Sequence, residues 1–174
     1  MLPLLIVATT DEQRLVEKYL PEYPVVHTGV GASNIIRTCY DIPRDTPVIN
    51  IGFAGSNNLP IGRVCLVSRS WRVRDDKFQF EDYRHGYELS AEGFPCYTGN
   101  EFVTETDKTE PTLFDMELNY IVAFPFRHLG AIKIVSDHLN LETYEETIVK
   151  SEDDVWKEVR ALVEKLAQDA NTHF

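Results

Sequence analysis

The stretch LLIVATTDEQRLVEKYLPEYPVVH, residues 4–27, decides the fold class. It opens with the apolar run Leu4–Ala8, which is typical of a strand buried on both faces. Thr10 or Asp11 then caps a predicted helix, which the following prolines end. A second short apolar run at 23–27 predicts another strand. A strand, a helix and a second strand in this order indicate an α/β unit with parallel strands.

We expect this alternation to continue along the chain. Segments 48–51, 64–68 and 131–135 read as strands, and segments 32–40, 113–126 and 151–170 read as helices. Ile35 and Ile36 are expected to face the core, and residues 69–101 to form loops and short strands. Apolar strands separated by helices predict an α/β fold, with a mainly parallel twisted sheet flanked by helices.

The composition excludes several classes of protein. A length of 174 residues, 43% of them hydrophobic, suits one domain spanning 1–174. The net charge of −11 repels phosphates and anionic lipids, so we expect neither nucleic acid nor a membrane as partner. The apolar N-terminus lacks the basic region and cleavage site of a signal peptide, and no apolar run reaches the roughly 18 residues of a membrane span.

The three cysteines, Cys39, Cys65 and Cys96, are odd in number and widely spaced. This pattern argues against a disulfide framework or a zinc site and favours a reducing, cytoplasmic location. The five histidines have no metal-ligand spacing. We therefore expect neither a metal nor a cofactor.

Ligands of parallel sheets bind beyond the carboxyl ends of the strands, so the residues just after each strand are the informative ones. Two glycine-containing segments occupy such places, GVGASN at 29–34 and GFAG at 52–55. Each could cradle a phosphate or a nucleoside, and each could be a turn that needs positive φ, which is the commoner outcome. Asn34 stands where a dinucleotide fingerprint has its third glycine, so that motif is disfavoured.

Two carboxylates stand out. Asp137 follows an apolar strand, where a carboxylate has no packing reason to be, although it could cap a following helix. Glu117 lies within the apolar stretch FDMELNYIVAF, where it could equally be an exposed position on a helix.

Five segments, in order, resemble the purine nucleoside phosphorylase and nucleosidase superfamily. They are GVGASN (29–34), NIGFAGSNNLPIGRVCLVS (50–68), TGNEFV (98–103), FDMEL (114–118) and IVSDHLN (134–140). The FDME and VSD pair, about twenty residues apart, is the most specific part of the resemblance. Among the branches of the superfamily, the methylthioadenosine and adenosylhomocysteine nucleosidases look most similar. The resemblance implies a trimmed nucleoside-phosphorylase-like fold.

The resemblance also implies roles for single residues. Asp137 matches the general acid that protonates or hydrogen-bonds the purine N7 as the glycosidic bond breaks. Glu117 matches the glutamate that binds the ribose hydroxyls, and Met116 the residue that packs under the sugar. Phe102 matches the aromatic residue that stacks on the base, whose edge the backbone of Val103 would contact.

The nucleophile's side of the site is matched less closely. Glu12 matches the carboxylate that positions the attacking water in nucleosidases, or else Arg14 aligns with the anion ligand of phosphorylases. Ala54 and Gly55 are expected to line the substrate site. Phe53 stands where the family has a serine. Phosphorolysis is disfavoured because a phenyl ring cannot donate a hydrogen bond to phosphate.

Two further departures concern the base and sugar segments. Asn100 stands where the family pattern TGDxF has an aspartate, and Leu118-Asn119-Tyr120 replaces the small residues that usually follow D-M-E. The chain must therefore pack differently after Glu117.

The predicted function is hydrolysis of the N-glycosidic bond of an adenosine- or methylthioadenosine-like nucleoside, as in purine salvage. The alternatives are phosphorolysis of such a nucleoside and a degenerate family member that binds it without catalysis. The resemblance and the aromatic residues between 69 and 101 also favour a homodimer or higher homo-oligomer.

Overall fold

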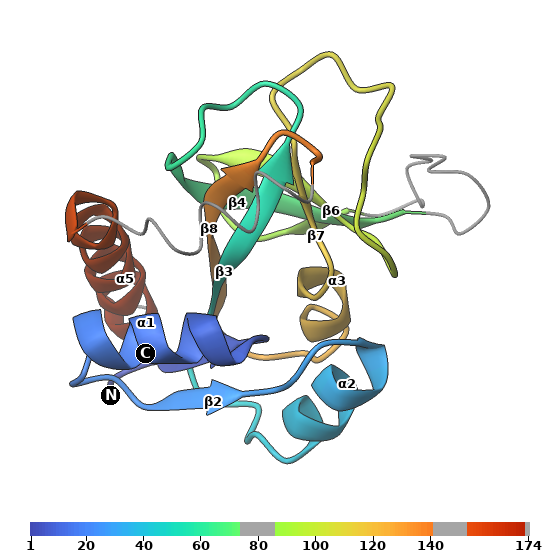
Figure 1. Cartoon of the computed structure of the whole chain (residues 1–174). Coiled ribbons are helices and arrows are strands. Elements are labelled where there is room, and N and C mark those ends of the chain that lie inside the picture. Colours follow the sequence, from blue (N-terminus) through green and yellow to red (C-terminus); the bar gives the residue numbers. More distant parts are fainter. Residues whose placement is uncertain (74–85, 141–152, 173–174) are drawn as a thin grey trace.

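The computed structural model describes residues 1–73, 86–140 and 153–172 (Figure 1). Its elements are β1 (Leu4–Val7), α1 (Thr10–Tyr19), β2 (Val25–His27), α2 (Ala32–Tyr40), β3 (Val48–Ser56), β4 (Val64–Arg72), β5 (Tyr87–Glu88), β6 (Phe94–Thr98), β7 (Leu113–Asp115), α3 (Leu118–Ile121), β8 (Leu129–Asp137) and α5 (Asp153–Thr172). No helix among the described residues has the length and apolarity that crossing a membrane requires.

The strands form one sheet, and most of the candidate site described below lies beside its strand β3. β3 runs parallel to β1 and to β8, and its last residues pair with β7 in the antiparallel sense. The pairs β1–β2, β4–β6 and β6–β7 are also parallel, whereas β4 is antiparallel to β5 and β8. This mixed but mainly parallel sheet confirms the α/β fold class.

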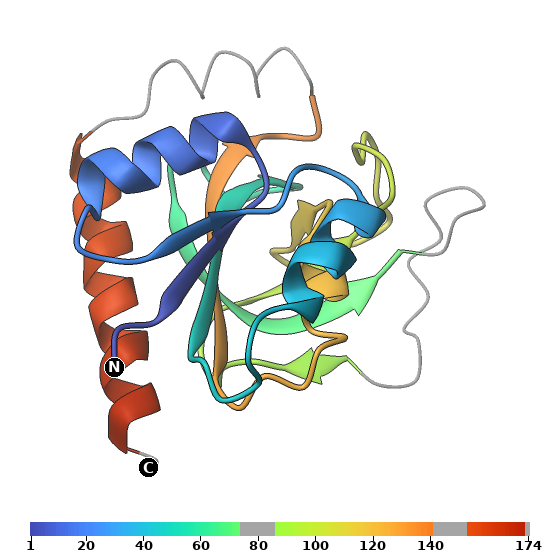
Figure 2. The same ribbon diagram turned by 90° about the horizontal axis from the view of Figure 1, so that it is seen from below.

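Helices cover the sheet on two sides (Figures 1 and 2). α1 and α5 pack against one face of β1 and β3, where Leu5, Ile51 and Val159 share a buried cluster. α2 and α3 pack against the opposite face, where Ile6 and Ile35 belong to another cluster. Successive residues of β1 thus point to opposite faces, as strand geometry dictates, and both faces are apolar because both are covered.

Two expectations about helices were wrong. Ile35 is fully buried, but the neighbouring Ile36 is 46% exposed, because one turn of α2 presents only one stripe to the sheet. The expected helix at 113–126 is instead the strand β7, which pairs with β6 and β3, followed by the short helix α3. α3 begins only after Asp115, whose carboxylate accepts the backbone N–H of Leu118 at 2.9 Å.

The expected glycine-rich turn at 52–55 was also wrong. β3 continues through these residues to Ser56, and all nine of its residues are buried. The strand persists because β8 runs alongside it as far as Asp137. By contrast, Gly29 and Gly31 lie in a connection with φ of 82° and 97°, so the turn interpretation holds there.

Candidate active site

Asp137 ends β8 with its carboxyl group buried. The residue is 1% exposed. The Ser136 hydroxyl donates to Oδ2 at 2.7 Å, and the backbone N–H of Leu139 donates to Oδ1 at 2.8 Å. Burial raises the pKa of Asp137 above its ordinary value, and hydrogen bonds from Ser136, Leu139 and Asn140 offset only part of this effect. The neutral acid therefore persists to a higher pH than in an ordinary aspartate.

Gly55 lies against this carboxyl group on the neighbouring strand. The register of β3 and β8 shifts between Ala54 and Gly55, so that Gly55 pairs with Asp137. A Cβ atom on Gly55 would lie 2.7 Å from Asp137 Oδ1, closer than real side chains approach. The Ser136 hydroxyl also reaches the carbonyl oxygen of Ala54 at 3.3 Å. Ala54 and Gly55 thus lie directly beside Asp137.

Leu139 connects Asp137 to the segment predicted to hold a base. Its φ of 64° is unusual for a residue other than glycine. Its side chain packs against a buried cluster that includes Val103 and Phe114. Val103 therefore packs in the same cluster as Leu139, two residues after Asp137, and Phe102, half-buried, precedes Val103 in the chain.

A second group of charged side chains meets beside Gly52 of β3. We call Glu12, Asp115, Glu117 and Lys133 the buried charge cluster; none is more than 7% exposed. Lys133 Nζ lies 2.8 Å from Asp115 Oδ2 and 2.7 Å from Glu117 Oε1. A Cβ atom on Gly52 would lie 2.6 Å from Glu117 Oε1, 3.0 Å from Glu12 Oε1 and 3.3 Å from Lys133 Nζ. Three of the four charged groups therefore converge on one point of β3.

Glu12 reaches this point from the first turn of α1. Its Oε2 accepts the backbone N–H groups of Ala8 at 3.0 Å and Thr9 at 2.9 Å, and its Oε1 accepts that of Phe53 at 3.0 Å. Thr9 and Glu12 form a capping box, so the helix cap is Thr9 and not Thr10 or Asp11 as expected. Three backbone donors thus hold the Glu12 carboxylate in one orientation.

Sequence reasoning missed Lys133, the cation of the buried charge cluster. It is fully buried in β8, four residues before Asp137. The signal was present: a lysine inside the apolar run AIKIV has no packing reason to be there, which is the argument that singled out Asp137. Lysine is almost never fully buried unless it is paired, and here Asp115 and Glu117 pair with it.

The cluster holds one ammonium group against three carboxyl groups. Burial raises the pKa of Glu117 to about 8; Lys133 opposes this rise, and the neighbouring Asp115 and Glu12 add to it. For Lys133, burial works against the charged form, but the Asp115 and Glu117 carboxylates outweigh it and raise the lysine pKa. The ammonium group of Lys133 is therefore the fixed charge of the cluster.

The structure also places Phe53 and Arg14, the two other residues that the sequence associated with the nucleophile. Phe53 belongs to the buried cluster beneath α1 and α5, and its backbone N–H donates to Glu12. Arg14, the alternative anion ligand, has a 71% exposed side chain and pairs with the neighbouring Asp11 at 3.3 Å. Arg14 is therefore not part of the group that meets at Gly52.

The predicted residues thus fall into two groups. Asp137, Ala54 and Gly55 lie together at the end of β8, with Val103 linked to them through Leu139, and Glu12 and Glu117 meet Lys133 at Gly52. Met116, half-buried, lies between Asp115 and Glu117 in the chain. Among the described residues, no set of three or more His, Cys, Asp or Glu side chains is arranged to hold a metal ion.

Replacement of Gly52 by alanine should reduce both stability and any activity of the site. The new Cβ atom would force apart the side chains of Glu12, Glu117 and Lys133, and overpacking of this kind typically costs about 1–3 kcal/mol. Gly130→Ala is the matched control, because its Cβ would meet the apolar side chain of Leu166 at 2.7 Å. Urea unfolding should show both variants destabilised, but only Gly52→Ala should lose activity per folded molecule. Equal loss of activity in the two variants would contradict the role of Gly52.

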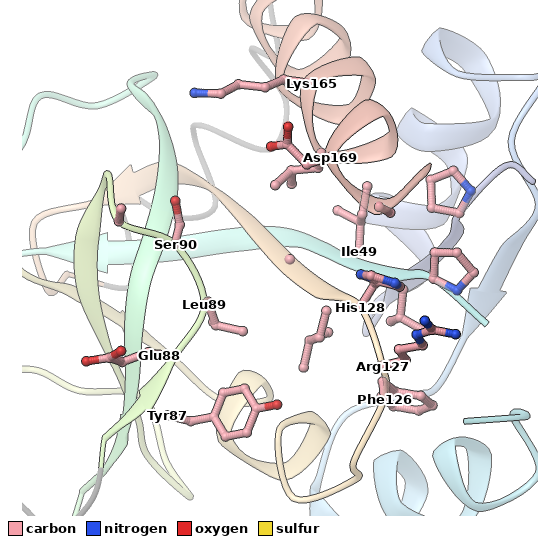
Figure 3. A pocket seen from close by; sticks show the side chains of 18 of the residues that line it. Ile49, Tyr87, Glu88, Leu89, Ser90, Phe126, Arg127, His128, Lys165 and Asp169 are labelled. Atoms are coloured by element: carbon pink, nitrogen blue, oxygen red, sulfur yellow. The ribbon is translucent and has the colours of Figure 1, made fainter. Parts of the chain in front are cut away.

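A hollow of about 520 Å³ lies at the other end of the sheet (Figure 3). Val48 and Ile49, at the start of β3, and Leu129, at the start of β8, form part of its lining, and Leu166 and Asp169 of α5 form another part. None of the predicted site residues lines it. It is therefore distinct from the two groups that lie beside Gly52 and Gly55 of β3.

Comparison with known proteins gives a fold but no sequence relative. No protein-family model matches the chain, and no curated protein matches it in sequence. The futalosine hydrolase of Helicobacter pylori strain 26695 superposes with a TM-score of 0.71 at 12% identity, over 93% of this chain and 97% of that one. The Chlamydia trachomatis nucleosidase MTAN, solved with adenine, gives 0.70 at 14% identity, over 95% and 100%.

A third solved structure also superposes on this chain. The 5′-methylthioadenosine/S-adenosylhomocysteine nucleosidase of Helicobacter pylori, bound to butyl-thio-DADMe-Immucillin-A, gives a TM-score of 0.70 at 14% identity, over 95% of this chain and 99% of that one. The chain therefore has the fold of these nucleosidase and hydrolase structures, in agreement with the predicted nucleosidase-like fold. Within that fold, these similar structures are nucleosidases and a futalosine hydrolase.

Proposed function

We propose that the protein hydrolyses the N-glycosidic bond of a purine nucleoside of the adenosine or methylthioadenosine type. The observation that supports this most strongly is that two different sets of buried polar side chains lie beside β3. A buried acid, Asp137, lies at Gly55, and the buried charge cluster lies at Gly52. The two points lie three residues apart, about 10 Å along β3, and we assign the base to the group at Gly55 and the sugar to the group at Gly52.

Asp137 is suited to assist departure of the base. When the bond between C1′ and the purine breaks, its electron pair passes to the base, which must be neutralised. A carboxylic acid whose pKa is raised by burial can give its proton to N7 at that moment. The hydrogen bonds from Ser136 and Leu139 fix the direction in which the carboxyl group points.

The charge cluster is suited to the sugar and the nucleophile. Glu117 can accept hydrogen bonds from ribose hydroxyls, and Lys133 holds its Oε1 in place at 2.7 Å. Glu12, fixed by three backbone N–H groups, can accept a proton from a water molecule that attacks C1′. The water oxygen then bonds to C1′, and the products are the free base and the free sugar.

The two alternative functions have less support. Phosphorolysis needs an anion ligand, but Arg14 is exposed and paired with Asp11. One reason to consider binding without catalysis is that Phe53 stands in place of the family's serine. However, Phe53 packs in the core beneath α1 and α5, and its backbone still donates to Glu12.

The rate should fall as pH rises through the raised pKa of Asp137. The protonated acid is the active form, so activity is retained below that pKa and lost above it. The same shift affects stability. Because the folded-state pKa exceeds the unfolded value, ionisation of Asp137 lowers the free energy of unfolding as pH rises between the two values. A pH profile of kcat/KM should show this loss above the raised pKa of Asp137, and a rate that rises steadily with pH would contradict a neutral Asp137 as the acid.

The test of the function is a base-release assay with and without phosphate. Adenosine and methylthioadenosine are incubated with the protein, and adenine and sugar are separated by chromatography. We expect adenine and free sugar at a rate that phosphate does not change. Phosphate-dependent formation of a sugar 1-phosphate would favour phosphorolysis, and ligand binding without adenine release would favour a non-catalytic binder.

A further inference from the structure

The segment that carries Phe102 and Val103 leaves the end of β6 and is held at both ends. At its start, the backbone N–H of Gly99 donates to the carbonyl oxygen of Asp115 at 2.9 Å. At its far end, Val103 is 5% exposed and packs with Phe114. Residues 99–103 therefore form a defined segment beside the start of α3. We call it the base segment, because the proposed function assigns it to the purine.

Tyr120 connects this segment to Glu117. Its hydroxyl donates a hydrogen bond to the side-chain oxygen of Asn100. Its backbone N–H donates to the carbonyl oxygen of Glu117 at 3.0 Å. The ring is 8% exposed and belongs to the buried cluster that includes Ile35. The buried Tyr120 thus contacts both the base segment and Glu117, the residue proposed to hold the sugar.

Neighbouring contacts also hold Tyr120 and the first turn of α3 in place. The Thr98 hydroxyl donates to Asp115 Oδ1 at 2.5 Å and accepts the backbone N–H of Asn119 at 2.9 Å. The Asn119 side chain donates to the Ser70 hydroxyl at 3.0 Å. The Arg72 guanidinium lies 5.3 Å from the centre of the Tyr120 ring. The first turn of α3 is therefore tied to the ends of β4 and β6.

The two residues that meet here are two of the departures from the family pattern. Asn100 replaces an aspartate, and Tyr120 replaces a small residue. A small residue at position 120 could not reach the base segment, whereas the tyrosine hydroxyl does. The two substitutions therefore act as a pair in this chain.

From this contact we infer that Tyr120 is a positioning residue, which fixes the base segment relative to Glu117 through Asn100. The inference rests on the proposed function, because it assigns the purine to the base segment. A nucleoside has a fixed distance between base and sugar, so a site must hold its two binding elements at a matching distance. The Tyr120–Asn100 bond performs this task and takes no part in the bond-breaking step.

Tyr120→Phe tests the inference, because it removes the hydroxyl and keeps the ring. The loss of one hydrogen bond should raise KM for methylthioadenosine about three- to tenfold and leave kcat within about twofold. The affinity for free adenine should weaken by a similar factor, and the melting temperature should stay close to that of the wild type. Tyr40→Phe, on the exposed side of α2, is the matched control and should change nothing.

A double-mutant cycle and hydrogen exchange complete the test. Asn100→Ala should weaken adenine binding as Tyr120→Phe does, and the double variant should lose no more than either single variant. Amide hydrogen exchange in 99–103 should quicken in Tyr120→Phe without any ligand. Additive losses, unchanged KM or unchanged exchange would overturn the inference. If the wild type neither binds adenine nor releases it, the proposed function fails, and exchange in 99–103 still decides the positioning role.

Discussion

Asp137→Asn should lower turnover of the nucleoside by about 10²-fold or more, with binding largely retained. An amide has the shape of the carboxyl group and can still accept the N–H of Leu139, but it cannot give a proton to the departing base. General-acid catalysis typically contributes about 10²–10⁴-fold, so its loss should be measurable directly as kcat. The variant should also lose the fall in rate that ionisation of Asp137 causes in the wild type.

Asp45→Asn is the control for this substitution. Asp45 is exposed in the connection between α2 and β3, so the same chemical change should leave kcat and KM as in the wild type. A second measurement uses base analogues that leave easily without protonation, for which Asp137→Asn should lose far less activity. A variant that keeps nearly full turnover on methylthioadenosine would remove Asp137 from its proposed role.

Lys133→Met should destabilise the protein by about 3–5 kcal/mol. Removing one partner of a buried ion pair leaves the other charges uncompensated, and here two carboxyl groups, Asp115 and Glu117, lie within 2.8 Å of the lost ammonium group. Methionine is close to lysine in volume, so the effect is electrostatic more than steric. The free energy of unfolding from urea titration gives the measurement. Lys157→Met, in an exposed pair with Asp154, should cost at most about 1 kcal/mol.

The loss in Lys133→Met should depend on pH in a definite direction. Without the ammonium group, the pKa of Glu117 should rise above its already raised value, because burial and the neighbouring carboxylates are no longer opposed. At acidic pH the carboxyl groups take up protons and the cost shrinks; at alkaline pH they must ionise and it grows. A destabilisation that is the same at acidic and alkaline pH would show that lost packing, and not uncompensated charge, is the cause.

The sequence predicted one half of the site better than the other. Asp137 stood out because an apolar strand led straight to a carboxylate, and that pattern needs only local information. Lys133 offered the same local signal, but its role depends on Asp115 and Glu117, which arrive from another part of the chain. Which charges meet inside the protein depends on which distant segments pack together, and a local sequence pattern does not specify that packing.

The fold, like the site, could be predicted from the sequence only in part. The α/β class followed from strands and helices that alternate along the chain, whereas the segment after Thr112 was mistaken for a helix. Leu113 and Phe114 are buried between β6 and β3, so an apolar run there serves a strand as well as it would serve a helix. Glycine-rich residues 52–55 likewise look like a turn until β8 is placed beside them. Tertiary pairing decided both cases.

A crystal structure with adenine tests the central claim most directly. The account predicts that adenine lies beside Gly55, with its N7 at hydrogen-bonding distance, about 2.6–3.2 Å, from the Asp137 carboxyl group. The base segment should contact the same ring, and Glu117 should remain free to receive a sugar on the side of Gly52. Adenine bound at the opposite end of the sheet, in the hollow of Figure 3, or bound with no contact to Asp137, would contradict the account.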